Sequence, residues 1–165
     1  MSWYKEYREQ WKEILETVAR ETARTEQMVE KDTIQSFFLY ELAKSALPFV
    51  FKGGTSLSKA YGLIDRFSED IDLSMNRRPT ESERRHTKNM LISIGEQLGL
   101  TLSNPEGIQS RHSYNRYVFQ YDSFFSKSPL EIVIETSFYQ NAYHQSPADI
   151  SAGDSMSSIS CMSCC

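Results

Sequence analysis

Cysteine is absent from the first 160 residues, and the three that occur lie at the end of the chain: Cys161, Cys164 and Cys165. No disulfide can therefore cross-link the body of the fold. Three cysteines within five residues, with no histidine nearby, also do not match the ligand spacing of a structural zinc site. The fold must be held together by its core alone.

Long hydrophobic runs are also missing. No stretch of about 18 apolar residues occurs, and the first six residues, MSWYKE, lack the apolar segment of a signal peptide. We therefore expect a cytoplasmic protein that makes no membrane contact. An excess of positive charge is missing as well: the net charge is −4 and the pI is near 5.4. A protein that coats nucleic acid is excluded, and any contact with RNA would need a local basic patch.

The 165 residues, 39% of them hydrophobic, are enough for one globular domain with a core. Periodic patterns continue to about residue 145 and then stop. Residues 146–165 are rich in Ser, Met and Cys without any periodicity. We predict a domain over residues 1–145, including N-terminal helices, followed by a disordered or non-native tail over 146–165.

Two helices are predicted before the middle of the chain. Tyr and Trp recur with Ile, Leu and Val at helical spacing over residues 3–28, which indicates an amphipathic helix. A second helix is predicted to begin at an N-cap on Asp32 or Thr33 and to end at Pro48, because proline cannot continue the hydrogen-bond ladder.

Strands are predicted from short apolar or alternating runs at residues 48–51, 70–74, 114–122 and 130–136. The last two form an antiparallel hairpin. The sequence TESE over residues 80–83 is a capping box that begins a third helix. Helices and strands thus alternate along the chain.

The most informative stretch joins a glycine turn to a pair of aspartates. Gly53 and Gly54 lack side chains that could block a phosphate, and a short helix is predicted after them over residues 56–61. Asp70 and Asp72 are two residues apart on a strand, so both carboxylates point to the same face. Close carboxylates repel unless a cation lies between them, and Mg²⁺ prefers such oxygen ligands. The combination predicts a phosphoryl- or nucleotidyl-transfer site.

A two-metal site of this kind needs a third carboxylate on a neighbouring strand. Glu131 and Glu135 lie on the same face of the strand predicted over 130–136. Either can supply the ligand, and either can instead be a solvated charge at the edge of a sheet. A basic cluster near the third helix is also open to two interpretations, a solvated face or a patch for nucleotide or RNA phosphate. It comprises Arg77, Arg78, Arg84, Arg85, His86 and Lys88.

Two motifs carry a family resemblance. FKGGTSL over residues 51–57 and RFSEDIDL over residues 66–73 closely resemble the signature of the AbiEii-type nucleotidyltransferase toxins, within the DNA polymerase β-like nucleotidyltransferase superfamily. The resemblance covers about residues 48–140. The segment IETSF over residues 134–138 is similar to a later strand of the family, which favours Glu135 over Glu131.

The resemblance implies an α/β (α+β) nucleotidyltransferase fold, with a small mixed sheet flanked by helices and with Mg²⁺ bound by Asp70, Asp72 and Glu135. An acceptor hydroxyl would attack the α-phosphate of a nucleoside triphosphate and release pyrophosphate. It further implies a bacterial toxin–antitoxin or phage-defence pair with a cognate antitoxin. The acceptor would be tRNA, another RNA or a protein side chain. The implied nucleotide-binding residues are Gly53, Gly54, Thr55, Ser56, Lys59, Arg66 and Ser68.

Members of this family continue into a C-terminal helical lobe that we expect this chain to lack. That expectation supports an alternative, a truncated and non-catalytic module of the same fold that binds nucleotide or a partner protein. A phosphatase or nuclease that uses the same metal pair is a third hypothesis. Serine–histidine catalysis has little support, because none of the three histidines lies in a recognisable nucleophile motif.

Overall fold

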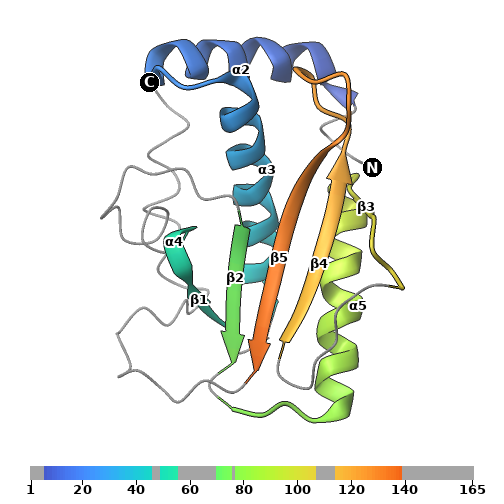
Figure 1. Ribbon diagram of the computed structural model, residues 1–165. Coiled ribbons are helices and arrows are strands. Elements are labelled where there is room, and N and C mark those ends of the chain that lie inside the picture. Colours follow the sequence, from blue (N-terminus) through green and yellow to red (C-terminus); the bar gives the residue numbers. More distant parts are fainter. Residues whose placement is uncertain (1–5, 46–48, 56–69, 76, 107–113, 139–165) are drawn as a thin grey trace.

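A computed structural model describes residues 6–45, 49–55, 70–75, 77–106 and 114–138 (Figure 1). Their centre is a five-stranded sheet in the order β1-β2-β5-β4-β3. The strands are β1 (Val50–Lys52), β2 (Asp70–Met75), β3 (Thr101–Leu102), β4 (Tyr114–Tyr121) and β5 (Leu130–Phe138). The pair β2–β5 is parallel and the other pairs are antiparallel, so the predicted mixed sheet is confirmed.

The helices are α2 (Arg8–Thr22), α3 (Glu26–Ala43), α4 (Gly53–Thr55) and α5 (Glu81–Gln97). Figure 1 shows α3 and α5 behind the sheet, with α2 lying across its upper end. Within the described ranges, no helix lies over the front face. No described helix is long and apolar enough to cross a membrane either.

The boundaries predicted for the first two helices are wrong. The first helix ends at Thr22, because Ala23 adopts a left-handed conformation with φ 53°. The second begins at Glu26, where the Thr25 side chain accepts a hydrogen bond from the Met28 amide at 3.3 Å. Asp32 and Thr33, predicted as N-caps, lie inside this helix.

The prediction for α5 is confirmed in detail. The Thr80 hydroxyl accepts a hydrogen bond from the Glu83 amide at 3.2 Å, and the Glu83 carboxylate accepts one from the Thr80 amide at 2.8 Å. This reciprocal pair satisfies two donors that the first turn of a helix leaves without a partner. The predicted helix over 56–61 and the tail over 146–165 lie outside the described residues.

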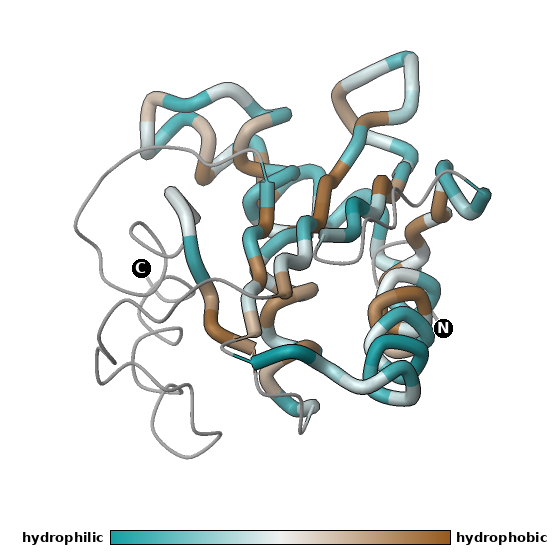
Figure 2. Tube along the Cα trace, turned by 60° about the horizontal axis from the view of Figure 1, so that its bottom comes forward, coloured by the Kyte–Doolittle hydropathy of each residue, from teal (hydrophilic) through white to brown (hydrophobic). Residues whose placement is uncertain are grey.

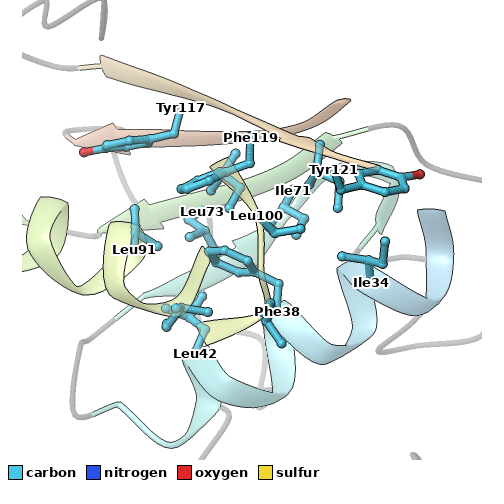
Figure 3. Close-up of a cluster of buried hydrophobic side chains, with 14 residues drawn as sticks. Ile34, Phe38, Leu42, Ile71, Leu73, Leu91, Leu100, Tyr117, Phe119 and Tyr121 are labelled. Atoms are coloured by element: carbon cyan, nitrogen blue, oxygen red, sulfur yellow. The ribbon is translucent and has the colours of Figure 1, made fainter. Parts of the chain in front are cut away.

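The core lies between the sheet and the pair α3 and α5 (Figure 3). Figure 2 shows hydrophobic stretches in the strands at the middle of the molecule. Alternate residues of each strand face the helices, as a period of two requires. Fully or nearly fully buried core residues include Phe38, Ile71, Leu73, Leu91, Tyr117, Phe119, Ile132 and Ile134.

A buried glutamate ties the loop between β4 and β5 to α3. Glu30 has an exposed fraction of 0%. Its carboxylate accepts hydrogen bonds from the Ser123 hydroxyl and, at 2.8 Å, from the Phe124 amide. The hairpin that carries Glu135 is thus anchored to the helical layer.

Candidate active site

The alternation that buries one face of the sheet places the predicted carboxylates on the other. Ile71 and Leu73 of β2 enter the core, so Asp70 and Asp72 project from the face that lies away from α3 and α5. Both aspartates are half-buried. The predicted common orientation of the pair therefore agrees with the burial pattern of β2.

The parallel pairing of β2 with β5 brings in the third carboxylate. Asp72 is in register with Glu135, and Glu135 is half-buried on the same face. Glu131 lies four residues earlier on β5, in register with Gln120 of β4, whose side-chain amide donates to it at 3.1 Å. The structure therefore brings Glu135, and not Glu131, to the aspartate pair.

One row of charged side chains crosses four strands of this face. Strand register places the four residues directly beside one another, and all are half-buried. From β1 to β4 the row consists of Lys52, Asp72, Glu135 and Arg116. Two carboxylates are thus flanked by a cation on each side.

The electrostatics of Asp72 reflect its neighbours. Burial is the main reason why the pKa of its carboxyl lies above the ordinary value. The negative charges of Glu135 and Asp70 raise that pKa further, and the nearby Lys52 ammonium opposes them. Crowded, partly desolvated carboxylates favour either a proton or a bound cation.

Two residues of β4 contact Glu135. The Arg116 Nε lies 3.6 Å from Glu135 Oε1, and the two side chains are 43% and 29% exposed. Tyr114 is in register with Ser137, diagonally across from Glu135, and burial together with the Glu135 carboxylate raises the pKa of its phenol to about 12. Tyr114 therefore remains protonated and can donate at neutral pH.

The glycine turn lies against the same aspartate. Gly53 follows β1 and begins α4, with a φ of +74° that favours glycine. A β-carbon on Gly53 would lie 2.0 Å from Asp72 Oδ2. Beyond leaving room for a phosphate, as the sequence predicts, the bare α-carbon of Gly53 makes room for the Asp72 carboxylate.

The remaining predicted nucleotide-binding residues are only partly described. Gly54 and the backbone of Thr55 lie in α4, which packs against β2. Ser56, Lys59, Arg66 and Ser68 lie outside the described residues. Their roles stay predictions.

The carboxylate oxygens on this face of the sheet are the type of ligand that a hard divalent cation binds. As positioned, no three His, Cys, Asp or Glu side chains in the described part of the chain are gathered closely enough to hold a metal ion. Glu135 is instead paired with Arg116. A metal would have to draw these carboxylates together, and its charge would offset the burial and the repulsion that raise the pKa of Asp72.

The basic cluster is partly occupied by contacts within the protein. The Arg77 guanidinium pairs with the Glu83 carboxylate, and the Arg84 guanidinium lies 5.5 Å from the centre of the Phe138 ring. The other members, Arg78, Arg85, His86 and Lys88, are exposed. Neither of the two interpretations of the cluster is tested by these contacts.

Sequence reasoning missed Lys52, Tyr114 and Arg116 as members of the site. A signal for Arg116 was present: in the predicted hairpin, pairing Tyr121 with Leu130 places Arg116 opposite Glu135. The sequence predicts the hairpin but not the register of its two strands.

Comparison with known families decides the identity of the fold. A family model described as the nucleotidyl transferase AbiEii toxin of type IV toxin–antitoxin systems matches residues 38–163. The chain belongs to the AbiEii nucleotidyltransferase toxin family. The resemblance read from the two motifs is thereby confirmed, and the matched range contains the glycine turn and all three carboxylates.

Solved structures agree with the AbiEii assignment. A candidate nucleotidyltransferase from H. pylori is 26% identical, with a TM-score of 0.51 over 68% of this chain and 46% of its own length. JHP933 from Helicobacter pylori is 26% identical, with a TM-score of 0.53 over 73% of this chain and 47% of its own. The AbiEii-family chain thus spans less than half the length of these structures. Comparison with curated proteins gives no match.

Proposed function

We propose that this chain is a metal-dependent nucleotidyltransferase of a bacterial toxin–antitoxin or phage-defence pair. It would transfer a nucleoside monophosphate from a nucleoside triphosphate to an acceptor hydroxyl. The observation that carries the proposal is the register of Asp72 with Glu135 beside the glycine turn. Membership of the AbiEii family supports the same reaction class.

In the proposed reaction, the acceptor oxygen forms a bond to the α-phosphorus of the nucleotide. The bond from that phosphorus to the oxygen bridging to the β-phosphate breaks, and pyrophosphate leaves with the bonding electrons. The hydroxyl proton passes to solvent. When bound, a hard divalent cation such as Mg²⁺ would neutralise the negative charge on the phosphoryl group.

The three carboxylates, the glycine turn and Lys52 each have a proposed part in this reaction. Asp70, Asp72 and Glu135 would hold Mg²⁺, since hard cations take carboxylate oxygens. The backbone of Gly53 and Gly54 would bind the triphosphate. Lys52 would supply positive charge at the triphosphate side of the row, since it lies next to the glycine turn.

The partners follow from the same proposal. The acceptor would be tRNA or another RNA, and a cognate antitoxin would oppose the activity in the cell. A nucleoside triphosphate as substrate also favours the cytoplasm as the place of reaction.

Transfer of label from α-³²P-labelled nucleoside triphosphates to total bacterial RNA tests the proposal. We expect Mg²⁺-dependent labelling that falls below detection in Asp72→Asn and Glu135→Gln. Glu131→Gln is the matched control, because Glu131 is a glutamate on the same strand and face but is in register with Gln120. Nucleotide binding without transfer to RNA or protein would instead indicate the non-catalytic module.

A further inference from the structure

The two ends of the row of four charged residues have different surroundings. Its β1 end, Lys52, is next to the glycine turn, and its β4 end, Arg116, lies on the far side of Glu135. Neighbouring strands are about 4.8 Å apart, so the backbone at Arg116 lies roughly 10 Å from that at Asp72 and roughly 14 Å from that at Lys52.

In-line transfer places the leaving pyrophosphate and the acceptor hydroxyl at opposite ends of this row. In phosphoryl transfer the attacking and leaving oxygens are roughly in line on opposite sides of the phosphorus. If the triphosphate lies on the glycine turn, pyrophosphate leaves toward the side of β1. The acceptor hydroxyl then approaches from the opposite side, over β5 and β4.

Arg116 is suited to bind an incoming anion there. Its contact with Glu135 is 3.6 Å long, beyond the 2.7–2.9 Å of a charge-assisted hydrogen bond, and its side chain is 43% exposed. A half-exposed ion pair of this length contributes little to stability, so its partners exchange at low cost. The guanidinium carries five donors in a planar fork that matches a phosphate group.

Tyr114 provides Glu135 with a second contact. It lies two residues from Arg116 on the same face of β4, and its phenol interacts with the Glu135 carboxylate. A hydroxyl group of β4 therefore stays near Glu135 when Arg116 turns toward another anion.

We propose that Arg116 is the acceptor-side binding residue of this site and that it recognises a phosphate group adjacent to the attacking hydroxyl. This inference rests on the proposed function. It assigns the acceptor to phosphate-bearing molecules, such as the end of an RNA strand, rather than to a serine or tyrosine hydroxyl of a protein.

Binding of two probes to the 165-residue chain tests the inference. The first probe is a nonhydrolysable nucleoside triphosphate with Mg²⁺, measured by calorimetry. The second is a fluorescent single-stranded RNA tetramer with a free 3′-hydroxyl, measured by anisotropy with and without the nucleotide and over a range of salt concentrations. The variants are Arg116→Gln and Arg116→Lys, and the control is Arg20→Gln, an exposed arginine in the last turn of α2.

We expect Arg116→Gln to raise the Kd for the RNA tetramer about fivefold and to reduce the slope of log K against log salt by about 0.7–1. The Kd for the nucleotide should change less than twofold. Arg116→Lys should restore the salt slope but only part of the affinity, since it keeps the charge and loses the fork. Arg20→Gln should change neither Kd.

Three results would overturn the inference. One is unchanged RNA affinity in Arg116→Gln, and another is an equal loss of nucleotide affinity, which would place Arg116 on the triphosphate side. The third is an equal effect of Arg116→Gln on a tetramer with uncharged methylphosphonate linkages. Failure of the wild-type chain to bind nucleotide with Mg²⁺ would instead reject the proposed function, and the RNA measurement without nucleotide separates the two failures.

Discussion

The Asp72 carboxylate occupies the space where any side chain on Gly53 would begin: a β-carbon there would lie 2.0 Å from Asp72 Oδ2. Two parts of the motif, 19 residues apart in the sequence, are thereby packed against each other. Both this close approach and the positive φ of Gly53 exclude other residues at position 53. Access to phosphate and placement of a proposed metal ligand thus depend on the same glycine.

Gly53→Ala is predicted to displace the Asp72 carboxylate and to abolish Mg²⁺-dependent nucleotide binding, measured by calorimetry. The left-handed backbone adds a cost of about 1–2 kcal/mol to the free energy of folding. Gly99→Ala is the matched control, because Gly99 has a similar φ of 78° after α5 and lies away from the carboxylates. Equal loss of binding in both variants would show that backbone strain alone explains the effect.

Asp72→Asn is predicted to stabilise the metal-free protein. The carboxylate is held with its pKa raised, so the ionised form is disfavoured on folding. Like charges directly opposite each other in a sheet are destabilising, and the amide removes that repulsion from Glu135. The gain in unfolding free energy should grow as pH rises through the pKa of Asp72 in the folded state. A gain in urea unfolding that is the same at pH 4 and pH 7 would contradict this explanation.

Glu30→Ala is predicted to destabilise the protein by roughly 3 kcal/mol in urea unfolding, since it leaves the Ser123 hydroxyl and Phe124 amide without their buried acceptor. Glu96→Ala, which removes an exposed glutamate of α5, should change stability by less than about 0.5 kcal/mol. A similar effect of the two substitutions would mean that solvent replaces the Glu30 carboxylate.

The start of α5 should be sensitive to acid. The pKa of Glu83 is lowered to about 2. The main cause is the hydrogen bond from the Arg77 guanidinium, and the second is the hydrogen bond from the Thr80 amide. Since the folded-state pKa is depressed, the stabilisation is present above about pH 4.5 and is lost as pH falls toward 2. We expect Glu83→Gln to reduce stability at pH 7 and to reduce it much less at pH 2.5. A difference from wild type that does not depend on pH would reject the ion pair as its source.

The elements that sequence predicted well are those with local signals. The capping box at Thr80 determines the start of α5, and alternation in the strands determines which face Asp70 and Asp72 share. The glycine turn and the aspartate motif were sufficient to suggest the family that the family model then showed.

The elements that were missed depend on contacts distant in sequence. The break between α2 and α3 occurs at Ala23, which adopts a left-handed conformation although it is not a glycine, so the sequence gives no signal for it. From sequence alone, Glu30 would be taken for a solvent-exposed polar residue of a helix; its burial is explained only by the contact with Ser123. Arg116 becomes part of the site only through the register of two strands, since a shift of one residue would turn it to the other face.

Calorimetric binding of the four nucleoside triphosphates, with and without Mg²⁺, to wild type and Asp70→Asn tests the central claim most directly. We predict that at least one nucleotide binds the wild-type chain when Mg²⁺ is present. That binding should be lost without Mg²⁺ and in Asp70→Asn. Absence of binding in wild type, or binding that the substitution leaves unchanged, would contradict the proposed metal–nucleotide site.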